Sequence, residues 1–160
     1  MSYILSNNQN NSLPFFQALA NIVYEMNVDK VAVITEDERA TVQFLTEATY
    51  LNIRVTNVLE FKTEAKNTTS QALNFINGLE GPQPVIVMIL DALTVLDVSE
   101  TISRTGLNNV PIWIMATVGL RQMNHLFAWK KVFNGGVVLE PYLPELEQFQ
   151  NYFQHALLVS

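Results

Sequence analysis

Short apolar runs rich in β-branched residues alternate with segments of helical periodicity along this 160-residue chain. The clearest run, Lys30–Thr35 (Lys-Val-Ala-Val-Ile-Thr), is apolar at consecutive positions, as expected of a strand buried on both faces. The segment Leu13–Met26 instead places its apolar residues three or four positions apart, as an amphipathic helix does. Strands that alternate with helices of this length indicate βαβ units and a parallel sheet.

The runs and the periodic segments predict five strands and five helices. We expect strands over 30–35, 54–62, 84–90, 111–115 and 136–139, and helices over 13–26, 38–51, 70–79, 94–105 and 144–158. Because crossover connections are right-handed, few arrangements are open to them. We expect an α/β fold with three layers, a flavodoxin-like five-stranded parallel sheet of order 2-1-3-4-5, helices on both faces and an additional helix in front. Residues 1–160 are expected to form a single domain.

The amino-acid composition excludes several classes of binding partner and of chemistry for this chain. The net charge of −6 argues against binding to a nucleic-acid backbone, so no nucleic acid is expected as a partner. There is no cysteine, which excludes disulfides and thiol chemistry. The longest apolar run, Val85–Leu90, is far shorter than the roughly 20 residues that span a bilayer, and the N-terminal residues do not resemble a signal peptide. Only 15% of residues are charged, against about 25% typically, which suits a surface that packs against another protein.

Ligands of parallel sheets bind beyond the carboxyl ends of the strands, and the residues at those ends can be identified in the sequence. They are Thr35, Glu36, Asp37, Glu38, Arg39, Asp91, Ala116, Thr117, Glu140 and Pro141. Four of these residues, Glu36, Asp37, Glu38 and Asp91, would place their carboxylates on one rim, which would suit a metal ion or an amine. The alternative is that Asp37, Glu38 and Asp91 favour the N-termini of the helices that follow them. Both interpretations stay open at this point.

Signatures of catalysis are missing from the sequence. His125 and His155 are isolated, no glycine-rich phosphate loop follows the first strand, and no nucleophile elbow is present. We therefore expect no enzymatic activity, no catalytic residue, no metal centre and no cofactor. Two N-glycosylation sequons begin at Asn10 and Asn67, which permits an extracellular location.

Three blocks of the chain resemble a known family. They are 15–38, with its helix, turn and apolar strand ending in Thr-Glu; 90–95, Leu-Asp-Ala-Leu-Thr-Val; and 133–141, Phe-Asn-Gly-Gly-Val-Val-Leu-Glu-Pro, followed by Phe149 and Tyr152-Phe153. In this order they resemble lobe 2 of a Venus-flytrap ligand-binding domain. This is the type I periplasmic-binding fold of metabotropic glutamate receptors and other class C G-protein-coupled receptors.

The resemblance also has departures at the ligand cleft. Where the amino-acid-binding receptors carry a tyrosine after Thr-Glu, this chain has Arg39. Where they carry an aspartate that holds the ligand amine, this chain has Thr117, so that of these acidic contacts Asp91 is the one retained. The resemblance therefore implies a degenerate amino-acid site, with ligand-binding residues Thr35, Glu36, Arg39, Asp91 and Thr117.

The function implied by the resemblance is extracellular ligand sensing at the plasma membrane. A small, amino-acid-like molecule would be held between this lobe and a first lobe that the chain does not contain. Closure of the two lobes, with rearrangement of a homodimer or heterodimer, would pass the signal to a membrane-spanning part.

A response-regulator receiver domain is the competing interpretation. Receivers use paired acids after the first strand, an aspartate after the third, a threonine after the fourth and a lysine before proline after the fifth. This chain offers Glu36-Asp37, Asp91, Thr117 and Glu140-Pro141. Glutamate in place of lysine reverses the charge that would pair with a phosphoryl group, so such a receiver would be a degenerate signalling or interaction module.

Overall fold

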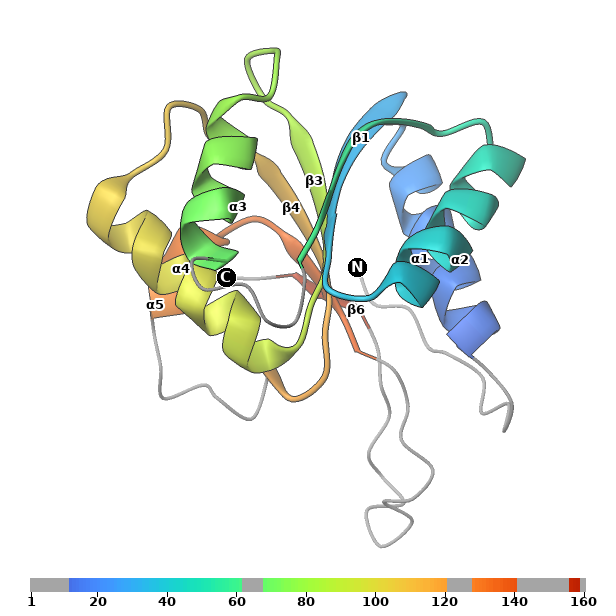
Figure 1. Ribbon diagram of the computed structural model, residues 1–160. Helices are drawn as coiled ribbons and strands as arrows, with labels where there is room; N and C mark the ends of the chain where they lie inside the picture. The colour runs from blue at the N-terminus through green and yellow to red at the C-terminus, as the bar shows by residue number, and fades with distance from the viewer. Residues whose placement is uncertain (1–11, 62–67, 121–127, 141–155, 159–160) are drawn as a thin grey trace, which may run out of the picture.

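The structure, a computed structural model, describes residues 12–61, 68–120, 128–140 and 156–158. Eleven elements follow one another in these residues (Figure 1): α1 (Ser12–Glu25), β1 (Lys30–Thr35), α2 (Glu38–Tyr50), β2 (Arg54–Glu60), α3 (Thr68–Asn77), β3 (Val85–Ile89), α4 (Ala92–Thr105), β4 (Ile112–Ala116), α5 (Ala128–Val132), β5 (Val137–Leu139) and β6 (Ala156–Leu158).

The sheet has the strand order β2-β1-β3-β4-β5-β6. Its first five strands are all parallel, in the order 2-1-3-4-5 that the sequence predicts. β6 is added to β5 in the antiparallel direction and lies at the edge opposite β2. Because the five strands are parallel, all their carboxyl ends meet at one edge of the sheet.

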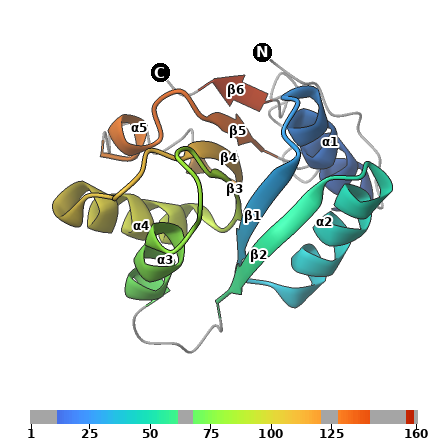
Figure 2. The ribbon, with the colours of Figure 1, turned by 90° about the horizontal axis from the view of Figure 1, so that it is seen from above.

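Helices cover both faces of the sheet and make three layers (Figure 2). On one face α1 and α2 pack against alternate strand residues, among them Val33, Val87 and Ile114. On the other face α3, α4 and α5 pack against the residues between them, among them Met88 and Trp113. Burial on both faces explains why β1, β3 and β4 are continuously apolar in the sequence.

Two expectations differ from the structure at the C-terminal end of the sheet. The helix expected over 144–158 is wrong at Ala156–Leu158, which form β6; residues 144–155 lie outside the described residues. A short apolar run has no periodicity that separates helix from strand, and pairing with the edge of β5 decides for strand. The short helix α5 was not predicted, and β2 ends at Glu60, two residues earlier than expected.

No helix among the described residues is long and apolar enough to cross a membrane.

Close approach of β4 and β5 depends on Gly136, which has an ordinary backbone conformation. A Cβ atom at this position would lie 2.8 Å from the carbonyl oxygen of Trp113 and 3.0 Å from the Trp113 Cβ. Neither atom belongs to the flexible end of a side chain, so the strands would have to separate.

We therefore expect Gly136→Ala to lower the free energy of unfolding by about 2 kcal/mol, the usual cost of overpacking a core. Gly78→Ala is the matched control, because Gly78 also lacks a positive φ and its nearest neighbour is 3.3 Å away. Urea unfolding of both variants measures the difference. Equal effects of the two substitutions would contradict the steric explanation.

Candidate functional site

A pocket of about 270 Å³ lies at the carboxyl edge of the sheet, beside the ends of β1, β3 and β4. It is lined by Phe15, Glu36, Asp37, Ala40, Ile89, Leu90, Asp91, Ala116, Thr117 and Val118. Most of these residues are apolar, and the polar ones come from the residues just after three different strands. This is where the topology of a parallel α/β sheet places ligands.

Glu36 connects the end of β1 to the start of α4. One carboxylate oxygen, Oε1, accepts a hydrogen bond from the backbone N–H of Asp91 at 2.5 Å, and Oε2 accepts one from the Thr94 hydroxyl at 3.3 Å. The backbone N–H groups at a helix N-terminus have no partner within the helix, so a carboxylate is favoured there. The contact fixes the Glu36 side chain beside Asp91.

Asp91 and Asp37 are helix N-caps. Asp91 Oδ1 accepts the backbone N–H of Thr94 at 2.8 Å, and Asp37 Oδ1 accepts that of Arg39 at 2.8 Å. For both residues the capping role that the sequence left open is therefore observed. Capping fixes the side chain of each residue at the start of the helix that follows it, at the rim of the pocket.

Burial and the neighbouring Asp91 both perturb the titration of Glu36. Partial burial raises the pKa of Glu36 above its ordinary value; the hydrogen bond from the Asp91 backbone lowers it, and the negative charge of Asp91 raises it further. A cation between the two groups would relieve the repulsion. The described residues nevertheless contain no group of three or more His, Cys, Asp or Glu side chains that could hold a metal ion.

The Thr117 side chain is the unusual feature of the pocket. It is 3% exposed, and its hydroxyl has no hydrogen-bond partner among the described residues. Thr35, at the equivalent end of β1, is also fully buried, but its hydroxyl is hydrogen-bonded to that of Thr41. Buried hydroxyls nearly always find a partner, so the Thr117 hydroxyl has the capacity to bind a group that is not part of the described residues.

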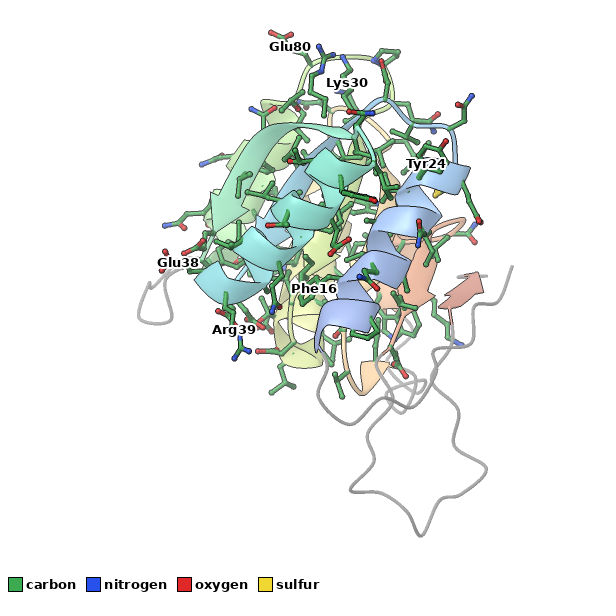
Figure 3. All side chains as sticks on the ribbon, turned by 90° about the vertical axis from the view of Figure 1, so that its right-hand side faces the viewer. Phe16, Tyr24, Lys30, Glu38, Arg39 and Glu80 are labelled. Carbon is green, nitrogen blue, oxygen red and sulfur yellow. The ribbon has the colours of Figure 1, made fainter. Side chains whose placement is uncertain are left out.

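Three of the five predicted ligand-binding residues, Glu36, Asp91 and Thr117, line this pocket, and two do not. Thr35 is buried against α2, and Arg39 is exposed on the first turn of α2, next to Glu38 (Figure 3). Glu140, at the end of β5, is buried. The sequon asparagines Asn10 and Asn67 lie outside the described residues.

Two apolar walls of the pocket were not anticipated from the sequence. Phe15 comes from the first turns of α1, and Val118 follows Thr117 with 45% of its surface exposed. The available signal was the position of Val118 two residues after the end of a strand. Phe15 had no such signal, because only the packing of α1 on the sheet brings it to this edge.

Comparison with models of protein families gives no match for this chain, and a search among curated proteins gives none either.

We expect Asp91→Asn to lower the pKa of Glu36, because the substitution removes the neighbouring negative charge. The pKa should stay above the ordinary value, since burial is the largest cause of the shift. Asparagine also caps helices well, so α4 should remain intact. Carboxyl carbon NMR measures the titration, with Asp97→Asn on the same helix as control; an unchanged pKa in Asp91→Asn would refute the proposed coupling.

Glu36→Gln tests the same carboxylate through stability. A raised folded-state pKa means that the stabilising contribution is complete below the unfolded pKa and is lost as the pH rises through the folded pKa. Wild type should therefore lose stability relative to Glu36→Gln as the pH rises above about 4. Solvent screening of this partly buried group keeps the change below about 1 kcal/mol. If the difference in melting temperature between wild type and Glu36→Gln did not change with pH, the titration of Glu36 would not be linked to stability.

Proposed function

We propose that this chain is the second lobe of an extracellular, metabotropic-glutamate-like (class C) ligand-binding domain with a degenerate amino-acid site. The observation that carries the proposal is the buried Thr117 hydroxyl in a pocket at the carboxyl edge of the sheet, which has no hydrogen-bond partner in the part of the chain that the structure describes. The sequence resemblance supplies the family, and the parallel sheet of order 2-1-3-4-5 is consistent with it.

The chemistry of the pocket favours a small ligand that bears an amine. Asp91 and Glu36 present negative charge at one side, and a ligand ammonium near them would form charge-assisted hydrogen bonds. Thr117 offers a hydroxyl that can donate or accept. Phe15, Ile89 and Val118 form apolar surface for the rest of the molecule.

The mechanism in this proposal is closure of two lobes on the ligand. The pocket holds only one side of a small molecule, so the rest of the contacts would come from a first lobe. A ligand that contacts both lobes binds the closed arrangement more tightly than the open one and shifts the population toward it. Val118, which lines the pocket and is 45% exposed, would be covered on closure.

The receiver alternative has less support. A receiver needs paired acids after the first strand and, after the third strand, an aspartate that accepts a phosphoryl group. In this chain Asp91 caps α4 and Glu36 is hydrogen-bonded to the start of the same helix. Glu140 remains where a receiver has its lysine.

Thr117→Val tests the proposal, because valine keeps the shape and removes the hydroxyl. We expect the variant to be more stable than wild type by about 1 kcal/mol, since an unsatisfied buried hydroxyl is costly. For a chain of this size the melting temperature should rise by about 2–4 °C. Calorimetric titration with single L-amino acids identifies the one that wild type binds most tightly. Thr117→Val should bind that amino acid about tenfold more weakly than wild type does.

Thr35→Val is the matched control. Its hydroxyl is satisfied by Thr41, so this variant should lose about 1 kcal/mol of stability and should keep its amino-acid affinity. A Thr117→Val variant that is destabilised, or that binds every amino acid as wild type does, would count against a ligand role for Thr117. Failure of wild type to bind any amino acid would reject the degenerate amino-acid site.

A further inference from the structure

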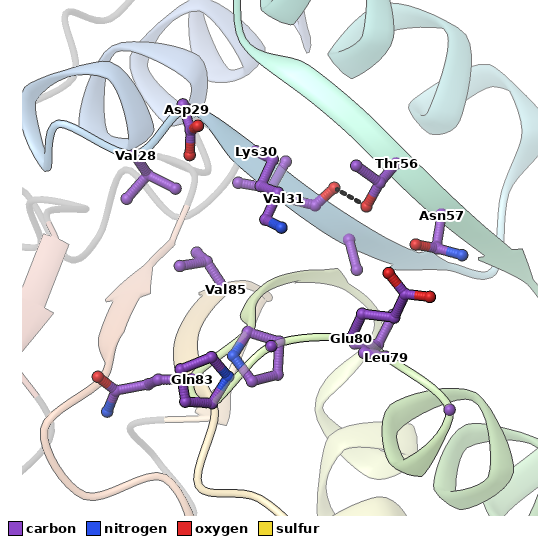
Figure 4. A pocket seen from close by; sticks show the side chains of 15 residues that line it. Val28, Asp29, Lys30, Val31, Thr56, Asn57, Leu79, Glu80, Gln83 and Val85 are labelled. Carbon is purple, nitrogen blue, oxygen red and sulfur yellow. Dashed lines mark hydrogen bonds between the residues drawn. The ribbon is translucent and has the colours of Figure 1, made fainter.

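A second hollow lies at the opposite, amino-terminal edge of the sheet (Figure 4). Its volume is about 450 Å³, larger than that of the pocket at the carboxyl edge. The floor is formed by β1 and β2, and one wall by the loop between α3 and β3, residues 78–84. All of its lining residues belong to the described part of the chain.

Three local features of the chain create this hollow. Ala32 lies between two valines in β1, and its small side chain leaves space above the strand at this position. The register between β1 and β2 shifts after Val31, where Val31 pairs with Val55 but Ala32 pairs with Asn57. This bulge turns Asn57 to the same face as Ala32, and bulges commonly re-aim a side chain in this way at functional sites. The extra residue, Thr56, is anchored to the Val31 carbonyl oxygen.

The wall of the hollow is conformationally restricted. Pro82 and Pro84 have fixed φ angles, and the loop passes through Gly81 at φ 99°. The carbonyl oxygen of Pro84 accepts the backbone N–H of Ile112 at 2.9 Å, which ties the loop to the start of β4. A hollow with such walls is already formed before a ligand arrives.

The polar side chains of the hollow carry both signs of charge. Lys30 projects into it from β1, and Glu80 lies across from it with its carboxylate toward Asn57 (Figure 4). Neither Lys30 nor Glu80 makes an ion pair or a side-chain hydrogen bond within the described residues, and Asp29 adds a further carboxylate at the end near Val28. Leu79 and Val85 supply apolar surface between these groups.

The lining also excludes several ligand classes. It contains no aromatic side chain, so a nucleobase or a sugar ring would have no surface on which to stack. It contains no arginine and no helix N-terminus, the groups that most often hold phosphate. A positive and a negative side chain that line the same hollow, together with aliphatic surface, match a small molecule with both charges and an aliphatic body.

We propose that this hollow is a second binding site, which takes a small aliphatic zwitterion of the amino-acid or dipeptide class. Lys30 holds the ligand carboxylate, Glu80 and the Asn57 amide oxygen hold its ammonium group, and Leu79 and Val85 contact its aliphatic part. The site does not depend on the pocket at the carboxyl edge. The two lie at opposite ends of β1, which is six residues long and therefore spans about 20 Å.

Amide NMR of the ¹⁵N-labelled full chain tests this assignment with L-leucine and two analogues that each lack one charge, isopentylamine and 4-methylpentanoate. L-leucine should shift the amide signals of Ala32, Asn57 and Leu79 with a dissociation constant in the millimolar range, about 1–10 mM, because the charged groups are solvent-exposed. Each analogue should bind at these residues about fivefold more weakly.

Lys30→Gln and Glu80→Gln should each weaken L-leucine binding at these residues about fivefold, and the matched surface variants Lys131→Gln and Glu38→Gln should not. Thr117→Val should leave the shifts unchanged, which separates this site from the pocket at the carboxyl edge. The assignment is overturned if L-leucine shifts none of these signals, if the single-charge analogues bind as tightly, or if Lys30→Gln and Glu80→Gln bind as wild type does.

Discussion

Burial of both faces of the parallel sheet is the constraint on which the rest of the structure depends. β1, β3 and β4 have almost no exposed side chain, so helices must cover both sides of them. Crossover connections through those helices align the strands in one direction. Alignment in turn brings Thr35, Glu36, Asp91 and Thr117 to a single edge, although they lie far apart in the sequence.

The same carboxylates stabilise the fold and shape the pocket. Asp37 and Asp91 cap α2 and α4, and Glu36 accepts a hydrogen bond from the first turn of α4. These contacts hold the side chains in fixed positions at the rim, where burial and then the nearby charge of Asp91 raise the pKa of Glu36. Fixed negative charge beside an apolar surface is a suitable environment for an amine, because little reorganisation is needed when the ligand arrives.

Much of this arrangement could be predicted from the sequence. The continuous β-branched runs and the helical periodicities led to the strand order, and the position of Glu36, Asp91 and Thr117 after strands led to the pocket edge. The missing information concerned tertiary packing. The burial of Thr35 against Thr41, the arrival of Phe15 from α1 and the pairing of Ala156–Leu158 with β5 all depend on contacts between distant segments.

The hollow at the amino-terminal edge likewise could not be predicted from the sequence. Lys30, Asn57 and Glu80 carry no motif, and a bulge between β1 and β2 decides that Asn57 faces Ala32. A shift of one residue in register moves a side chain to the opposite face of a sheet, and sequence periodicity does not reveal it. Function at either edge therefore has to be tested on the folded chain.

In the function proposed for this chain, the carboxyl edge of the sheet binds a small amine-bearing ligand through Thr117. A crystal structure of the chain grown with L-amino acids at about 10 mM, well above a millimolar dissociation constant, tests it most directly. We expect ligand density in the pocket, with a polar ligand atom within hydrogen-bond distance of Thr117 Oγ1 and the ammonium group beside Asp91. A Thr117 hydroxyl that is hydrogen-bonded to another part of the chain, in a pocket without ligand, would contradict it.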